Sequence, residues 1–176
     1  MISKRREEDQ VNLIKTGAFK PFSDGDKDFD EWLLLNRARY AVYRARELEL
    51  QRYGLTPEQS QILFVVRGLK EDATPATISR ETFLKSHTIS AIVSRMEDKG
   101  LLKKTNDLKH KNQVRVSITK KGEEAYQLSS KRGPIHRVMN ALSQTERKQL
   151  GPLLEKILFA ASEELGLNRD TLPSSD

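Results

Sequence analysis

Residues 89–122 read ISAIVSRMEDKGLLKKTNDLKHKNQVRVSITKKG, and the spacing of apolar side chains changes in the middle of this stretch. Before Gly100 they recur every three or four residues, which predicts a helix over about 86–99 with Gly100 as its left-handed C-cap. After Gly100 they alternate, which predicts strands over 101–105 and 113–119. The connection between the strands is polar and basic. The stretch therefore predicts a helix followed by a β-hairpin with a charged tip.

Two cap signals predict helices upstream of this stretch. Thr56-Pro57-Glu58-Gln59 combines an N-cap, a proline at the first helical position and a capping box. Thr74-Pro75 repeats the cap and the proline, and opens a short helix to about Phe83. The tight turn at 84–85 then leads into the helix of 86–99. This order predicts a helix-turn-helix followed by a hairpin that serves as its wing.

Longer helices are predicted on both sides of this region. Residues 29–52 carry an apolar stripe at helical spacing, made of Leu34, Ala38, Ala41, Val42, Ala45 and Leu48. A second helical segment runs over 119–142 and is broken or bent at Gly133-Pro134. Ser143-Gln144-Thr145-Glu146 is another capping box, and it opens a Leu-rich helix that contains Pro152, where we expect a kink.

Composition narrows the class of protein. The chain has 176 residues, 36% of them hydrophobic, which suits one domain or a small domain with an oligomerisation element. It contains no cysteine, which excludes disulfides, thiolate metal sites and thiol redox sensing, and its three histidines are too scattered to suggest a metal site. We expect no metal and no cofactor. With no apolar run long enough to span a membrane and no secretory signal, we expect a cytoplasmic protein without a membrane partner.

The positive charge is concentrated in one part of the chain. Residues 80–122 hold eleven Lys or Arg against four Asp or Glu, a net charge of +7, whereas the whole chain carries +6. Such asymmetry indicates a polyanionic partner, with nucleic acid first. A solvated Lys-rich face is the alternative.

The segment 89–122 resembles the MarR family of bacterial transcription regulators. The shared pattern comprises a helix end, a wing and a following strand, and here it is filled by Ser90, Val93, Met96, Glu97, Gly100, Asp107, Val114, Val116, Ser117, Ile118, Thr119 and Gly122. Leu55 to Gln59 also resembles the opening of the family's second helix. The family's wing usually reads Asp-x-x-Asp-Arg-Arg, whereas His110, Lys111 and Asn112 fill its last three places here, and Ala91 stands where Arg is common.

The resemblance implies a mainly α fold with a small β-hairpin, a winged helix-turn-helix lobe and a helical dimerisation platform. Within a single domain over 29–166, we expect the lobe at 56–119 and the platform at 29–53 and 120–166. Residues 1–28 would form an N-terminal arm, and residues 167–176 a tail.

Candidate DNA contacts lie on the 86–99 helix and on the wing. We expect the helix to present polar groups to base edges or phosphates and the wing to contact the backbone. The candidates are Lys85, Ser86, His87, Thr88, Ser90, Ser94, Arg95, Lys109, His110, Lys111, Asn112 and Arg115. For Ser86, His87, Thr88 and Ser90 the alternative is helix capping, or polar side chains that only face water. Arg95 is expected to contact a phosphate or to form an ion pair that braces the wing, rather than to contact a base.

Two further sites are expected. By analogy with the family, Tyr40, Tyr43 and Arg44 would line a pocket for a small organic anion, with core or interface packing as the alternative. The Leu-rich carboxyl-terminal stripe would form a homodimer interface, because so small a lobe has little material to cover it. The interface residues would be Leu150, Leu154, Ile157, Leu158 and Ala161, and an internal core is the alternative.

No Gly-rich phosphate loop, nucleophile elbow or metal-spaced histidine motif is present, so we expect no enzyme activity. The expected function is that of a DNA-binding transcription regulator, in the first place a repressor, whose homodimer binds a pseudo-palindromic operator on double-stranded DNA and is released by a small organic effector. The alternatives are a winged-helix module that docks an acidic protein surface and a nucleic-acid-binding protein without sequence preference.

Overall fold

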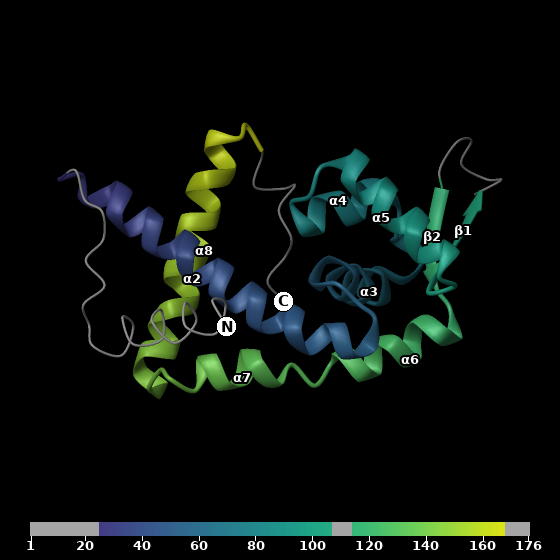
Figure 1. Cartoon of the computed structure of the whole chain (residues 1–176). Coiled ribbons are helices and arrows are strands. Elements are labelled where there is room, and N and C mark those ends of the chain that lie inside the picture. Colours follow the sequence, from purple (N-terminus) through teal and green to yellow (C-terminus); the bar gives the residue numbers. More distant parts are fainter. Residues whose placement is uncertain (1–24, 107–113, 168–176) are drawn as a thin grey trace, which may run out of the picture. The chain divides into compact units, whose positions relative to one another are not determined.

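The computed structural model describes residues 25–106 and 114–167, which are mainly helical with one two-stranded sheet (Figure 1). The chain divides into two compact units within helix α2 (Lys27–Leu50), the first ending at Val42 and the second beginning at Tyr43. In the first unit, the Phe29 and Trp32 rings stack with their centroids 5.4 Å apart. Among the described residues, we find no helix with the length and hydropathy of a membrane span.

The second unit begins with the end of α2 and the short 3-10 helix η1 (Gln51–Tyr53), which Gly54 closes at φ 66°. Helix α3 (Pro57–Leu69) then starts at the predicted capping box, in which the Thr56 hydroxyl accepts from the Gln59 N–H and the Gln59 side chain accepts from the Thr56 N–H. A second 3-10 helix, η2 (Lys70–Asp72), follows it.

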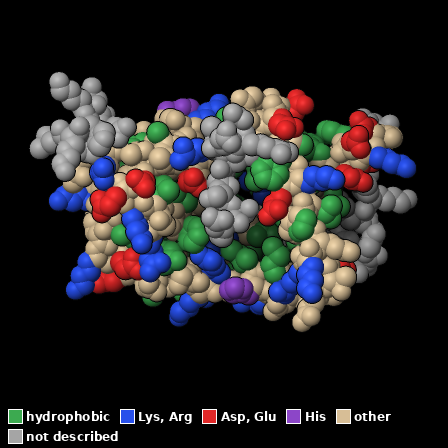
Figure 2. All heavy atoms as spheres, turned by 180° about the vertical axis from the view of Figure 1, so that it is seen from behind, with side chains coloured by type: hydrophobic (Ala, Val, Ile, Leu, Met, Phe, Trp, Pro, Cys, Tyr) green, Lys and Arg blue, Asp and Glu red, His purple; other side chains and the backbone are tan. Residues whose placement is uncertain are grey.

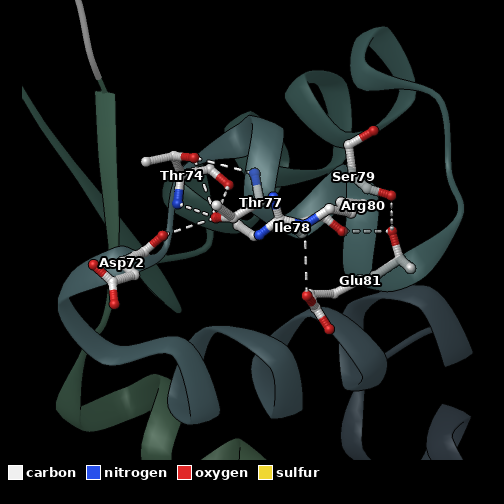
Figure 3. A network of polar contacts seen from close by, with 8 residues as sticks. Asp72, Thr74, Thr77, Ile78, Ser79, Arg80 and Glu81 are labelled. Atoms are coloured by element: carbon white, nitrogen blue, oxygen red, sulfur yellow. Dashed lines mark hydrogen bonds and ion pairs between the residues drawn. The ribbon is translucent and has the colours of Figure 1, made fainter. Parts of the chain in front are cut away.

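The helix-turn-helix is confirmed as α4 (Pro75–Thr82) and α5 (Ser86–Asp98). Figure 3 shows Thr74 and Thr77 facing each other at the start of α4, where they form a capping box, with the Thr77 hydroxyl also donating to the Asp72 carbonyl at 2.8 Å. The turn between the helices contains Phe83 in the left-handed region, at φ 56°. Gly100 follows α5 at φ 69°, as predicted.

The predicted hairpin is also present. Strands β1 (Leu102–Asn106) and β2 (Val114–Ile118) pair antiparallel, with Leu102 opposite Ile118 and Lys104 opposite Val116. The free edge of β2 is partly covered, because the Val116 N–H donates to the Ala73 carbonyl at 2.8 Å. Figure 1 shows the hairpin beside α5, next to the helix-turn-helix. Its predicted tip, residues 107–113, lies outside the described residues.

One hydrophobic core holds the lobe together. It consists of buried apolar side chains from the end of α2, from α3, α4 and α5, and from the hairpin. Its largest members are Leu50, Ile62, Leu63, Ile78, Ile89, Met96 and Leu102. The predicted stripe of α5 is therefore confirmed as core.

Three helices follow the hairpin: α6 (Lys120–Ser129), α7 (Gly133–Met139) and α8 (Gln144–Glu164). The break predicted at Gly133-Pro134 lies over residues 130–132, with Arg132 at φ 49°. Ser143 and Glu146 form the predicted capping box, and Pro152 lies inside α8. The pKa of the Glu146 carboxyl is lowered, chiefly by the hydrogen bond from the Ser143 side chain.

The first long helix predicted over 29–52 is present as α2, and the apolar stripe along it is largely exposed in this chain. Leu34 is 61% exposed and Leu48 is 59% exposed, whereas Arg46 and Leu50 are buried. Several side chains of α8 are exposed too, with Ile157 at 51%. Figure 2 shows hydrophobic side chains reaching the surface among charged ones.

Candidate nucleic-acid interface

Helix α5 has one buried face and one polar face. Ile89, Ile92, Val93 and Met96 face the core, so the residues on the opposite side of the helix point outward. Of the predicted contact residues, Lys85, Ser86, His87, Ser90 and Arg95 are exposed, and Thr88 and Ser94 are half-buried. The structure thus brings all seven helix candidates to the start and outer side of α5.

Ser86 does not cap α5, although its position in the sequence allowed that interpretation. Lys85, with ψ 143°, is the N-cap residue and supplies no side-chain acceptor, whereas Ser86 is already helical. The Ser86 hydroxyl lies 3.3 Å from the Ser79 hydroxyl instead. The interpretation of Ser86 as a cap is therefore wrong. The positive end of the helix dipole remains without a capping carboxylate or hydroxyl from its N-cap residue, an arrangement that favours an anion.

Two outward side chains bond to their own helix. The Ser90 hydroxyl donates to the Ser86 carbonyl at 3.0 Å, and the Arg95 Nε donates to the Ala91 carbonyl at 3.2 Å. The Arg95 guanidinium therefore lies along the outer face of α5, and its position beside Ala91 gives that face a positive charge. His87 lies at the exposed start of the same face.

Glu97 links the recognition-type helix to the wing, a role that sequence reasoning missed. Its Oε1 accepts from the Lys104 backbone N–H at 2.8 Å, and its Oε2 lies 2.8 Å from the Lys104 Nζ. The hydrogen bond from the Lys104 side chain is the main cause that lowers the pKa of the Glu97 carboxyl. The seven-residue separation between a helical carboxylate and a strand lysine gave no local signal for this pairing.

Arg115 at the base of the wing is bonded within the lobe. Its Nη1 donates to the Glu71 carbonyl at 2.9 Å and lies 3.3 Å from the Glu71 Oε2. We expected the positive charge of Arg115 to be available to DNA. In the structure, the Glu71 carboxylate partly neutralises that charge. The other wing candidates, Lys109, His110, Lys111 and Asn112, lie outside the described residues.

The three residues expected to bind an effector each have another partner. The Tyr43 hydroxyl donates to Glu58 Oε1 at 2.5 Å, Arg44 pairs with Glu47 at 2.6 Å, and Tyr40 packs against the Arg39 guanidinium. Burial raises the pKa of Glu58, but hydrogen bonds, first that from Tyr43, outweigh it and leave the pKa lowered.

A hollow of about 370 Å³ lies elsewhere in the second unit. It is lined by residues of η1, the end of α5 and α6: Tyr53, Gly54, Leu55, Lys99, Leu101, Lys121, Glu124, Ala125 and Leu128. Both of its lysines donate to backbone carbonyls, Lys99 to Gly54 at 3.3 Å and Lys121 to Lys99 at 2.7 Å. These bonds give the lysines a structural role at the end of α5. Within residues 25–106 and 114–167, no three His, Asp or Glu side chains gather as a metal site would require.

The residues expected at a dimer interface share one side of α8. Leu154, Ile157, Leu158 and Ala161 are exposed, and Leu150 is half-buried. Their apolar surface is therefore uncovered in the single chain.

Comparisons with known proteins agree on one family. Residues 53–111 match the profile of the MarR family. The chain is 24% identical over 119 residues to the transcriptional repressor MdtR of Bacillus subtilis, covering 65% of this chain and 75% of MdtR.

Solved structures extend the likeness beyond the lobe. The organohalide-sensing regulator RdhR-CbdbA1625 in its ligand-free form has a TM-score of 0.71 and 28% identity, covering 78% of this chain and 83% of that one. Another structure of it contains 2,4-dichlorophenol, with a TM-score of 0.67, 27% identity and coverages of 79% and 88%. The Staphylococcus aureus MepR–DNA complex shares the fold, with a TM-score of 0.68, 19% identity and coverages of 73% and 96%.

Proposed function

Because the chain belongs to the MarR family of DNA-binding transcription regulators, we propose that it is a homodimeric repressor that occludes a pseudo-palindromic operator. One observation carries the proposal: the outward face of α5 is polar and basic at its exposed start, and the wing hairpin lies next to it. The role is regulatory rather than catalytic, as it is in the relatives.

The two parts of the interface have different tasks in this proposal. The start of α5 enters the major groove, where base pairs are distinguishable, and Ser86, His87, Thr88 and Ser90 contact bases or phosphates. Lys85 and Arg95 add phosphate contacts along the helix. Lys109 and Lys111 of the wing supply point charges to the DNA backbone, because the wing lacks the arginines usual in the family.

The dimer would be held by helices outside the DNA-binding lobe of residues 56–119. The uncovered apolar side of α8 supports this arrangement, since a face of this kind is otherwise exposed to water. The platform then comprises residues 29–53 and 120–166. Twofold symmetry gives half-sites about 10 base pairs apart, or a multiple of that spacing.

An effector, where one acts, is a small organic anion that reaches Tyr40, Tyr43 and Arg44. The 2,4-dichlorophenol in the RdhR-CbdbA1625 structure supports an aromatic ligand. Such a ligand would compete with Glu58 for the hydrogen bond of the Tyr43 hydroxyl. Tyr43→Phe should then change the response to a phenolic ligand more than it changes DNA affinity.

The deciding experiment is selection of bound DNA from a random library, followed by salt titrations on the selected site and on a scrambled copy. The proposal expects a twofold-symmetric site and clear preference over the scrambled DNA. A steep salt slope without preference would instead support a non-specific nucleic-acid-binding protein. No DNA binding, with binding to an acidic protein surface, would support the interaction module.

A further inference from the structure

The break between α6 and α7 is held by a buried ion pair from a third helix. Residues 130–132 leave the helical path, and Pro134 occupies the first turn of α7. Facing this break, on α2, are Arg46 and Glu49, whose side chains are only 10% and 13% exposed and pair directly. Buried charges of this kind need further partners to offset their desolvation.

Arg46 satisfies the end of α6. Its Nη2 donates to the Ser129 carbonyl at 2.5 Å and to the Ser60 hydroxyl of α3 at 3.3 Å. The last carbonyls of a helix lack intrahelical donors and form the negative end of its dipole, so a guanidinium is the complementary group. One side chain of α2 thus joins α3 to the carboxyl-terminal end of α6.

Glu49 satisfies the start of α7. Its Oε1 accepts from the Gly133 N–H at 3.0 Å. The first N–H groups of a helix form the positive end of its dipole, so a carboxylate is the complementary group there. The two charges of one ion pair therefore meet the two helix ends that flank the break, each with the opposite sign.

We propose that Arg46 and Glu49 are positioning residues that fix the angle between α6 and α7, and through it the distance between the two recognition helices of the dimer. Helix α6 is tied to the lobe through the Arg67–Glu123 pair at 3.1 Å, whereas α7 leads into α8. Because the proposed dimer contact lies on α8, the break stands between the part that reads DNA and the part that joins the subunits. The inference rests on the proposed homodimeric operator binding.

The first test measures the break itself. The chain has no cysteine, so Lys120→Cys and His136→Cys accept spin labels at two defined positions, one on α6 and one on α7. A single straight helix would separate these positions by about 24 Å along its axis. We expect one narrow distance distribution in the parent chain, and a broadened or shifted one after Arg46→Met and Glu49→Leu are introduced together. This double replacement removes both charges, so no unpaired charge stays buried.

The second test measures how DNA affinity depends on half-site spacing, with operators that carry one or two inserted base pairs between the half-sites. The unchanged protein should lose about tenfold or more in affinity on insertion, because each base pair rotates one half-site relative to the other. The double variant should lose less than about threefold, since a loose break adapts to either spacing. Should it not fold, Glu49→Gln replaces it, because its amide oxygen can still accept from the Gly133 N–H while the ion pair with Arg46 is lost. Its loss of affinity on insertion should lie between those of the parent chain and the double variant. A variant with Arg46→Lys alone, which retains the positive charge, should keep part of the preference for the original half-site spacing.

Glu47→Gln is the matched control, since it removes a carboxylate from the other three-residue Arg–Glu pair of α2, that with Arg44, whose side chain is 69% exposed. It should leave both the label distance and the spacing preference unchanged. An unaltered label distance in the folded double variant would overturn the inference, and so would an altered distance with the parent's spacing preference. An unchanged protein that binds symmetric DNA without any spacing preference would instead contradict the proposed dimeric operator binding.

Discussion

Glu97 of α5 contacts Lys104 of β1 through both of its carboxylate oxygens. One oxygen lies 2.8 Å from the Lys104 backbone nitrogen, and the other lies 2.8 Å from its side-chain nitrogen. The recognition helix and the first strand of the wing are thereby joined through one side chain. We expect a substitution that shifts either element to act on the other through this carboxylate.

We expect the contact between Glu97 and the wing to depend on pH. Because its pKa in the folded chain is lowered from an ordinary value of 4.5, the ionised contact stabilises the fold above that value, and this stabilisation is lost as pH falls through the folded pKa. In two-dimensional NMR spectra, the Lys104 amide should titrate with an apparent pKa below 4.5. The same amide should not titrate in Glu97→Gln. A midpoint at or above the ordinary value would contradict the assignment.

Gly122 at the start of α6 should tolerate no side chain. An added Cβ would lie 2.0 Å from the Leu101 carbonyl oxygen and 2.8 Å from Ile118 Cγ1. Gly122→Ala should therefore lower the free energy of unfolding by about 1–3 kcal/mol, as overpacking does. Gly68→Ala is the control, because nothing lies within 4 Å of its added Cβ in α3. That control should raise the free energy of unfolding by about 0.5–1 kcal/mol, and urea titrations measure both.

Glu71 should restrain non-specific DNA binding. Its carboxylate, 91% exposed, partly neutralises Arg115 at the base of the wing. In Glu71→Ala, the guanidinium, which no longer pairs with that carboxylate, should bind scrambled DNA more tightly and steepen the salt slope by about one per subunit. Adding Arg115→Ala should reverse the change. An identical slope in Glu71→Ala and the unchanged protein would show that Arg115 does not reach phosphate.

Helix and wing substitutions should separate specificity from general affinity. Thr88→Ala should change base preference, with about 1–3 kcal/mol lost for a good base contact. Lys111→Ala should weaken all DNA alike and lower the salt slope by about one per subunit, or roughly two per dimer. Binding to a set of single-base operator variants at several salt concentrations measures both. Relaxed preference at one base pair with an unchanged slope in Lys111→Ala would reverse the assignment.

The apolar side of α8 predicts the oligomeric state. Leu154→Glu and Leu158→Glu together should release monomers and abolish binding to the symmetric operator, because both exposed leucines would become charged in the interface. Light scattering gives the mass directly. Lys156→Glu, at an exposed polar position of the same helix, should leave the dimer intact. A tight dimer after both leucine changes would move the interface elsewhere.

Local signals predicted the helix starts well, because an N-cap contacts residues only a few positions further along the chain. Thr56, Thr74 and Ser143 all cap helices where the sequence indicates, and Gly100 has the expected positive φ. The alternation in β2 likewise predicted Val116 as buried. In each case, the residues that decide the structure lie within a few positions of one another.

Contacts between residues far apart in the sequence could not be predicted from local patterns. A charged side chain on a helix is normally solvated, yet Arg46 is buried because Ser129, far along the chain, supplies its acceptor. The spacing in α2 predicted the helix correctly, but helical spacing marks an apolar side without saying which surface covers it. The sequence candidates at the start of α5 could be found because exposure there follows from the buried stripe, whereas Glu71 and Glu97 became visible only through their partners on the hairpin.

The backbone conformation of Phe83 lowers the stability of the helix-turn-helix, so replacing this residue should raise the free energy of unfolding. A bulky residue in the left-handed region, as at its φ of 56°, costs about 1–2 kcal/mol relative to a residue that adopts that region readily. Asparagine tolerates this backbone, and the Phe83 ring is 42% exposed, so its removal empties no deep part of the core. The turn is therefore a position where the lobe can be engineered to withstand heat while the residues that face DNA stay as they are.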